Sequence, residues 1–477
     1  MAEIKTAARV ARNSVFLFTG EVVSKAAFLI LTFFIARFLG DRGFGKFAFA
    51  LSFTSIFMIF ADMGLTTLTI REVAKEKNNA ARYIGNVALM KIALALFTWL
   101  FIFAAINLMK YPRDTTCAVY LMGIAMIASS FTEAFSSVFR AYEKMEYVSF
   151  LSIFQKITCA VLGILVLAKG GKLLGAVYAY LVASVLTFLL AVLILMGKFV
   201  KPEFEINLRL WKDLIKEACP IGLAVFFSAV YFRIDTVLLS LLEGDAVVGW
   251  YNAAYKPMEA MMFVPISFIG ALFPIFSNFY ASSRQALVIV YTKAVKILLI
   301  IILPVAIGTT VLAPRLIRLF YGVQFANSAA ALRILIWACV VIFVNYVLTQ
   351  LLIAMGKQKF NARFTLICAG FNIILNLMLI PLLSYIGASI VTLVTEALLF
   401  GLCFYVVSKE LEVIPLIGIA IKPLIASLFM ASVLLLIRQA PLMLTIPLSA
   451  AVYGIAILLL RTFDRSDFLI LKEAVKE

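Results

Sequence analysis

Long apolar runs separated by short polar turns recur along the whole chain. A helix needs about 20 apolar residues to cross the roughly 30 Å of hydrocarbon in a bilayer, and these runs are long enough. Backbone polar groups inside lipid must be satisfied within a helix or a closed barrel, so the pattern predicts an all-α integral membrane protein. About fourteen spans are predicted, near residues 14–38, 46–70, 83–108, 117–138, 147–168, 174–197, 219–242, 249–279, 289–312, 327–354, 363–383, 386–407, 416–437 and 443–460.

Two stretches depart from this simple pattern. Residues 201–218 place Leu208, Trp211 and Leu214 on one helical face with charged residues elsewhere, which is typical of a helix in the membrane interface. An ordinary linker between spans is the alternative. The eighth predicted span contains Pro257, Pro265 and Pro274, and we expect it to be kinked.

The chain contains an internal repeat. Three segments recur in the same order: GDRGFG at 40–45 with GDAVVG at 244–249, AYEK at 141–144 with AMGK at 354–357, and Gly175-Ala176 with Gly387-Ala388. An even number of spans in each copy gives a parallel repeat, related by an axis along the membrane normal, and substrate sites in such transporters lie between the halves. The repeat predicts two pseudo-symmetric six-helix lobes around a central cavity plus two extra C-terminal helices.

The corresponding domains are an N-terminal lobe over 1–200, an interfacial linker helix over 201–218, a C-terminal lobe over 219–410, and two helices with a cytoplasmic tail over 411–477. Lysine and arginine concentrate in the loops on the side of the N-terminus. This bias places both termini in the cytoplasm, for a multi-pass protein of the plasma membrane. The apolar run after Asn13 is too long for a signal peptide and is interpreted as a retained span.

Composition excludes several classes of function. At 64% hydrophobic residues and a mean hydropathy of +1.08, the chain is not a soluble domain. The net charge of +17 resides at the ends of apolar runs, as for anchors at anionic lipid headgroups, so nucleic acid is not the expected partner. The chain has no histidine, and its six cysteines form no CxxC pair, which argues against metal sites, cofactors and histidine-based catalysis. No catalytic residue is predicted.

Charged residues inside the predicted spans are the candidate functional groups, because such charges are energetically expensive and usually face a cavity or a partner. The candidates for a cationic substrate site are Arg233, Lys25, Lys91 and Lys256. The candidates for coupling to H⁺ or Na⁺ are Asp62, Asp235, Glu21 and Glu396. Guanidinium and ammonium groups suit a phosphate or diphosphate ligand. The alternative is that these residues form salt bridges between helices.

Spacing adds detail to these candidates. Glu21 and Lys25 are four residues apart, so they can pair on one helix face, and Lys256 can pair with Glu259 three residues on. Arg233 and Asp235 are two residues apart and point in different directions on one helix, so neither can neutralise the other along its own span. Lys256 could also serve as an interface anchor, and so could Glu133.

Several segments in a fixed order resemble the polysaccharide/oligosaccharide flippase family of the multidrug/oligosaccharidyl-lipid/polysaccharide exporter superfamily. These segments are FRAYEKMEY from Phe139, RIDTVLLSLLEGDAVVGWYNAAYK from Arg233, ALRILIWAC from Ala331, AMGKQKFN from Ala354 and NIILNLMLIPLLSYIGASIVTLVTE from Asn372. The resemblance covers essentially the whole chain. It implies transfer of a polyprenyl-linked oligosaccharide between leaflets by alternating access, with a cationic cavity for the phosphate-sugar headgroup.

The expected partners are therefore a lipid-linked oligosaccharide, membrane lipids, and the glycan polymerase or ligase machinery. In the relatives that flip the peptidoglycan precursor, the last two helices form a lipid groove. Two other functions remain open: a cation-coupled multidrug or metabolite exporter of the same fold, and a membrane glycosyltransferase or polymerase. Embedded basic residues favour an anionic headgroup over a cationic drug. The chain lacks the large catalytic loops of the polymerases.

Overall fold

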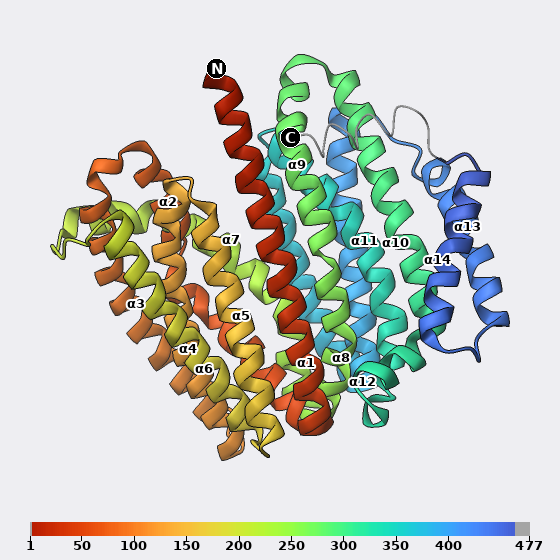
Figure 1. Ribbon diagram of the computed structural model, residues 1–477, viewed down its shortest axis with the longest axis horizontal. Coiled ribbons are helices and arrows are strands. Elements are labelled where there is room, and N and C mark those ends of the chain that lie inside the picture. Colours follow the sequence, from red (N-terminus) through yellow and green to blue (C-terminus); the bar gives the residue numbers. More distant parts are fainter. Residues whose placement is uncertain (1, 463–477) are drawn as a thin grey trace. The chain divides into compact units, whose positions relative to one another are not determined.

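The computed structural model describes the backbone of residues 2–462 and the side chains of Asn13 and residues 16–462. No strand occurs in this part of the chain, so the predicted all-α class is confirmed (Figure 1). The long helices are α1 (Ala2–Asp62), α2 (Leu65–Lys75), α3 (Ala80–Leu108), α4 (Arg113–Ala141), α5 (Met145–Ala168), α6 (Leu173–Ile194), α7 (Leu208–Leu242), α8 (Asp245–Met261), α9 (Phe263–Ser282), α10 (Arg284–Phe320), α11 (Ser328–Ala354), α12 (Gln358–Glu410), α13 (Leu416–Leu436) and α14 (Leu442–Leu459). Short helical segments are η1 (Lys77–Asn79), η2 (Leu195–Phe199) and η3 (Val323–Phe325).

Twelve stretches of the described residues are long and apolar enough to cross a membrane. Two of them, in α1 and α12, each contain a pair of predicted spans. Non-helical backbone bends α1 at Gly40 (φ 71°, ψ −176°) and α12 at Ser384 (φ 54°, ψ −138°). Counting each of these bent helices as two spans gives about the predicted number of spans.

The predicted span 46–70 is wrong at its end, because the helix breaks at Met63 and Gly64. Both residues have positive φ, at 46° and 86°, and α2 then starts as a separate helix. A Cβ at Gly64 would lie 2.8 Å from the carbonyl oxygen of Ala218 on α7. A Cβ at Gly222 would likewise lie 2.7 Å from the carbonyl carbon of Met63. The break is thus also a point where α7 approaches the backbone of the α1–α2 junction.

The predicted kink in the eighth span is confirmed as a break at Met262, between α8 and α9. Proline has no backbone N–H, so Pro265 cannot donate to the carbonyl of Met261 one turn earlier. The missing hydrogen bond falls at the junction of the two helices. Pro257 and Pro274 lie inside α8 and α9 without ending them.

The amphipathic segment before the seventh span continues without a break into α7. Asn207 caps the helix by accepting a hydrogen bond from the N–H of Leu210 at 3.1 Å. Leu214 and Ala218 are buried in a cluster with residues of α2 and α3, so part of the apolar face packs on protein. Leu208 on the same face is 69% exposed.

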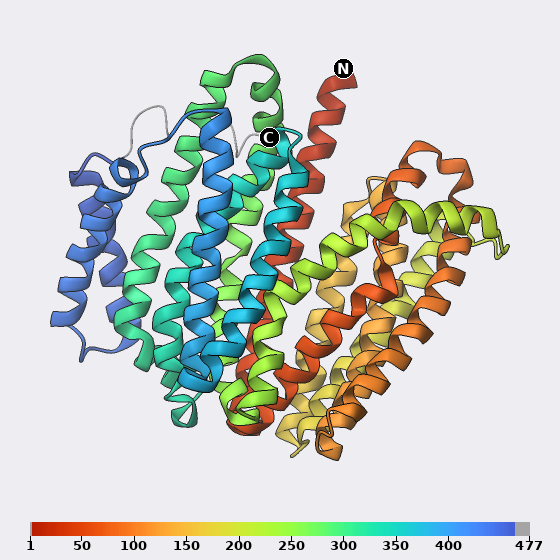
Figure 2. The ribbon, with the colours of Figure 1, turned by 180° about the vertical axis from the view of Figure 1, so that it is seen from behind.

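The chain divides into two compact units, residues 1–252 and 253–477. In the first unit, α1 packs on α4, α5 and α7, and α6 packs on α4 and α5 (Figure 1). In the second, α10 packs on α11 and α13, and α11 on α12, while α13 also packs on α14 (Figure 2). The lobe boundaries expected from the repeat remain a prediction, and the tail beyond Thr462 lies outside the described residues.

Both copies of the first repeated motif begin with a glycine of positive φ. Gly40 has φ 71° and Gly244 has φ 88°, and both values lie in the left-handed region that favours glycine. The segments 40–45 and 244–249 both belong to the first unit. The left-handed glycine is therefore repeated along with the sequence.

These two turns pack against each other reciprocally. A Cβ at Gly45 would lie 1.7 Å from the carbonyl oxygen of Asp245, and a Cβ at Gly249 would lie 2.2 Å from the carbonyl oxygen of Asp41. Neither distance leaves room for any side chain. Gly45 and Gly249 are equivalent positions of the repeat, and so are Asp41 and Asp245. Each glycine faces the aspartate of the other copy, so the contact has the symmetry of a local two-fold axis.

The side chains that follow the two glycines repeat the exchange. Lys46 Nζ lies 3.9 Å from Asp245 Oδ2, and Trp250 Nε1 donates to Asp41 Oδ2 at 3.1 Å. Lys46 also donates to Asp114 at the start of α4 at 2.5 Å. We call this contact, formed by residues 40–46 and 244–250, the paired turn.

We predict that Gly45→Ala and Gly249→Ala each destabilise the protein, because the new methyl group meets backbone that cannot move aside. Overpacking of this kind typically costs about 1–3 kcal/mol. The measurement is the thermal unfolding midpoint of the full chain in detergent, followed by tryptophan fluorescence. Gly454→Ala is the matched control, since a Cβ at this helical glycine meets nothing within 4 Å. Equal midpoints for all three variants would contradict the paired turn.

Candidate functional site

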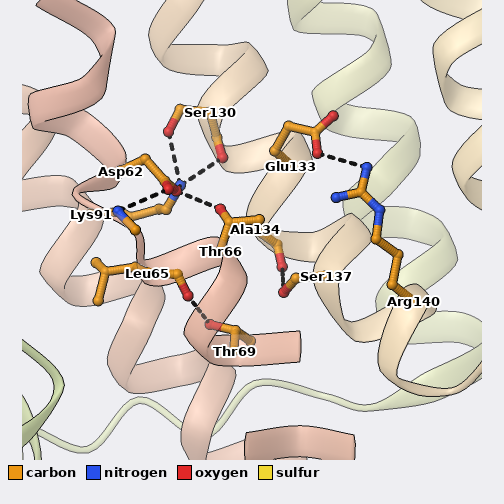
Figure 3. Close-up of polar contacts among 11 residues, drawn as sticks. Asp62, Leu65, Thr66, Thr69, Lys91, Ser130, Glu133, Ala134, Ser137 and Arg140 are labelled. Carbon is orange, nitrogen blue, oxygen red and sulfur yellow. Dashed lines mark hydrogen bonds and ion pairs between the residues drawn. The ribbon is translucent and has the colours of Figure 1, made fainter. Parts of the chain in front are cut away.

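The most buried charge among the predicted site residues is Lys91 on α3, whose side chain is 1% exposed. Its Nζ donates to Asp62 Oδ1 at 2.5 Å, to the Ser130 carbonyl at 2.9 Å and to Ser130 Oγ at 2.9 Å (Figure 3). All three donors of the ammonium are therefore satisfied within the protein. Lys91, a lysine predicted to bind substrate, therefore forms an ion pair with Asp62, a carboxylate predicted to couple transport to H⁺ or Na⁺.

Asp62 is the last residue of α1 and stands at the break before α2. Its carboxylate also accepts from the Thr66 hydroxyl and, at 3.2 Å, from the N–H of Gly64. Its side chain is 31% exposed, unlike that of Lys91. The carboxylate therefore holds the turn between the two helices as well as balancing the lysine.

The Glu21–Lys25 pair expected on the first span is confirmed, with Lys25 Nζ 3.0 Å from Glu21 Oε1. The Glu21 side chain is 48% exposed and the Lys25 side chain is 28% exposed. Both groups remain accessible to a ligand or to water, in contrast to the buried Lys91.

A polar cavity of about 180 Å³ lies within the first unit, between α1, α4, α5 and α6. Its charged lining residues are Glu21, Glu133 and Arg140, and its hydroxyl and amide lining residues are Thr132, Ser136, Ser149, Ser152, Gln155 and Thr187. Glu133 and Arg140 form an ion pair at 3.1 Å (Figure 3). Such a wall can donate and accept hydrogen bonds to water or to a hydroxylated ligand.

Most of the lining hydroxyls are engaged by the protein. Thr132 and Thr187 donate to carbonyls one turn earlier in their own helices, and Ser152 bonds to Ser24 at 3.0 Å. Ser136, which is 2% exposed, also lines the cavity.

Arg233 and Asp235 lie on α7 in the first unit. Asp235 is 3% exposed and accepts a hydrogen bond from the Tyr251 hydroxyl at 2.9 Å. Arg233, two residues before it, is half-buried. The carboxylate is therefore held by a neighbouring helix of its own unit.

The remaining predicted residues lie in the second unit. The expected Lys256–Glu259 pair is confirmed, with Nζ 2.7 Å from Glu259 Oε2. Glu396 is 3% exposed, and Asn345 donates to its carboxylate at 2.8 Å and to its backbone carbonyl at 2.9 Å. In the residues 2–462 that the structure describes, no group of three or more His, Cys, Asp and Glu residues could hold a metal ion.

The sequence-based search missed one embedded cation, Lys156 on α5. Its Nζ lies 4.8 Å from the ring centroid of Phe28 and 5.6 Å from that of Tyr180. The signal was present, because this lysine stands in the middle of the predicted span 147–168. The cavity hydroxyls gave no such signal, since serine and threonine in membrane helices commonly bond to their own backbone.

Comparisons with known proteins agree with this architecture. The family described as "Polysaccharide biosynthesis protein" matches residues 10–280, and the MatE family matches residues 220–378. The chain is 23% identical over 389 residues to the probable low-salt glycan biosynthesis flippase Agl15 of Haloferax volcanii, covering 81% of each protein.

Two solved structures share the fold. The lipid II flippase MurJ in an inward closed conformation has a TM-score of 0.76 at 16% identity, covering 93% of this chain and 97% of that one. An inward-facing multidrug resistance MATE family transporter of the MOP superfamily has a TM-score of 0.65 at 17% identity, covering 84% and 98%. The fold expected from the family resemblance is confirmed.

We predict unequal effects of breaking the Asp62–Lys91 pair. Removing one partner of a buried ion pair costs about 3–5 kcal/mol, because an uncompensated charge remains. Asp62→Asn leaves the fully buried ammonium without its counter-ion, whereas Lys91→Met leaves a carboxylate that is 31% exposed. Asp62→Asn should therefore lower the thermal unfolding midpoint more than Lys91→Met, and the double variant should recover part of the loss.

Purified full-length protein in detergent serves for this measurement. Arg140→Met, at a half-exposed ion pair of the same unit, is the control and should change the midpoint little. If the two single variants unfold like the wild type, the pair does not stabilise the fold.

Proposed function

Because this chain belongs to the polysaccharide biosynthesis protein family, we propose that it is a flippase for a polyprenyl-phosphate- or polyprenyl-diphosphate-linked oligosaccharide. It moves the headgroup from the cytoplasmic to the outer leaflet by alternating access. The observation that carries the proposal is the family match over residues 10–280, more than half of the chain. The chain is a multi-pass membrane transporter rather than an enzyme.

Names of related proteins support the choice of substrate class. Agl15 is named as a probable glycan biosynthesis flippase, and MurJ as a lipid II flippase. Both are named as flippases, one in glycan biosynthesis and the other for lipid II. The hydroxyl-rich cavity of the first unit is compatible with a sugar headgroup, since sugars need many hydrogen-bond partners.

The headgroup phosphate requires cations, and Arg233 and Lys25 are the residues we assign to it. Lys25 is accessible and paired with a carboxylate that is itself 48% exposed, so a phosphate can compete for it. Lys91 and Lys256 are also assigned to the cationic site, but each is held by an acid and would reach the phosphate only when that pair opens.

Energy for directed movement would come from H⁺ or Na⁺ binding at an embedded carboxylate, without any other cofactor. The candidates are Asp62, Asp235, Glu21 and Glu396. Asp235 and Glu396 are the two that are almost completely buried, and each accepts a hydrogen bond from a neutral side chain.

The same proposal places both termini in the cytoplasm and the protein in the plasma membrane. Its product would be used by glycan polymerase or ligase machinery at the outer face. A second function, export of a drug or metabolite coupled to a cation, is favoured by the MatE match at residues 220–378. The embedded basic residues favour the anionic substrate.

The proposed function predicts headgroup translocation in vesicles. Purified protein is reconstituted with a fluorescent polyprenyl-diphosphate oligosaccharide, and access of a quencher to each leaflet is followed with time. Arg233→Ala and Lys25→Ala should each slow the movement at least about tenfold, as expected for loss of a charge-assisted hydrogen bond to phosphate. Lys169→Ala, at the exposed end of α5, should move the lipid like the wild type.

Two results would overturn the assignments. Normal movement in both arginine and lysine variants, with normal insertion, removes these residues from the headgroup site. Absence of movement in the wild type, together with export of an organic cation by the same vesicles, favours the exporter.

Coupling is tested separately in the same vesicles. We expect collapse of either the proton or the sodium gradient to slow net movement, and Asp235→Asn or Glu396→Gln to abolish that dependence by removing the titratable carboxylate. The measurement is the translocation rate with and without each gradient. A translocation rate that is the same with and without each gradient would show that no carboxylate serves as a coupling group.

A further inference from the structure

Lys156 occupies a position that a membrane protein rarely gives to a charge. It stands at the centre of α5 (Met145–Ala168), about 17 Å from either end at 1.5 Å per residue. A lysine side chain cannot reach the interface over that distance by extending along the helix. An embedded ionisable residue of this kind is by default a candidate functional group.

Its surroundings differ from those of the other embedded lysines of the proposed site. Lys25, Lys91 and Lys256 each have a carboxylate within 3.0 Å. Lys156, by contrast, has no ion-pair partner among residues 16–462, whose side chains the structure describes. Among the described residues, three of these lysines are therefore paired with an acid, and the fourth contacts aromatic rings instead.

Two aromatic rings hold the ammonium in place. Phe28 of α1 lies at 4.8 Å and Tyr180 of α6 at 5.6 Å from Nζ, both within the range of cation–π interactions. The negative faces of the rings attract a cation and fix its position, but they carry no net charge. Phe28, which contacts Lys156, is three residues after Lys25 on α1. Lys25 and Lys156 therefore belong to neighbouring turns where α1 packs on α5.

The polar cavity adjoins this lysine. Ser152 and Gln155 line the cavity from the turn of α5 that precedes Lys156, and Glu21 lines it from the turn of α1 before Lys25. In both α1 and α5, the residues that line the cavity precede the lysine in the sequence. The hydroxyl-rich wall and the charge are thus successive parts of one polar region within the first unit.

The geometry points to Lys156 as an anion-binding residue of this polar region, contacting an acidic group of the transported lipid while the cavity takes a sugar. The inference rests on the proposed function. Its ligand is a phosphate or carboxylate, supplied either by the carrier's diphosphate or by an acidic sugar. An incoming anion would complete the neutralisation that the two rings leave unfinished, and the rings would keep Nζ in position for it.

A structural role for Lys156 predicts a different set of effects. If the lysine only joins α1, α5 and α6 through its rings, its replacement lowers stability without changing the preference for anionic ligands. Lys156→Met keeps the length and apolar stem of the side chain and removes the charge. Lys156→Arg keeps the charge and its interaction with the rings.

The experiment is equilibrium binding of two fluorescent probes to the full-length protein in detergent, at low and high salt. One probe is polyprenyl diphosphate without a sugar, and the other carries a glucuronate-containing disaccharide. Lys156→Met should bind at least one probe about tenfold or more weakly and lose most of the salt dependence, while Lys156→Arg should stay within about threefold of the wild type. Lys169→Met, at the exposed end of the same helix, is the matched control.

The outcomes separate the possible ligands. Weaker binding of both probes assigns the carrier's diphosphate, and weaker binding of the glucuronate probe alone assigns an acidic sugar. If Lys156→Met binds both probes like the wild type, the inference is overturned and the proposed function stands. If the wild type binds neither probe, the proposed function falls together with the inference. Thermal unfolding of each variant shows whether the fold is retained.

Discussion

The structure of the first unit depends on a close backbone contact that only glycine permits. At the paired turn, Gly45 faces a carbonyl of the other turn at a distance that excludes a Cβ, and Gly249 does the same in return. A second approach, between Gly64 and α7, uses the same device. Close contact of backbones between membrane helices requires small residues, because lipid supplies no hydrophobic force to drive helices together. These glycines therefore set how far α7 and the start of α8 can approach α1.

The contacts of the paired turn are reciprocal. A repeat in the sequence does not require this, because the two copies could lie far apart in the fold. Here Asp41 and Asp245 exchange contacts with Trp250 and Lys46, the residues that follow the two glycines. Corresponding positions touch one another only near a two-fold axis. Sequence repetition and spatial symmetry thus coincide at this point.

The sequence could predict what depends on local spacing. Span positions followed from runs of apolar residues, the break at Pro265 from a missing N–H, and the Glu21–Lys25 pair from helical periodicity. It could not predict the Asp62–Lys91 pair, whose partners are 29 residues apart on different helices. The break at Gly64 was also missed, because an apolar run with one glycine is compatible with a continuous helix until α7 is seen to lie against it.

The embedded lysines differ in whether a carboxylate of the protein pairs with them, and this difference bears on transport. A buried pair such as Asp62–Lys91 is satisfied without any ligand, so its charges serve the fold whether or not substrate is present. An ammonium held by rings alone is oriented but not neutralised, and its environment improves when an anion arrives. The distinction between these two kinds of lysine comes from the packing of α1, α5 and α6, and hydropathy cannot reveal it. The second kind of lysine can bind an anionic headgroup directly, whereas the paired lysines assigned to the headgroup site must first release their acids.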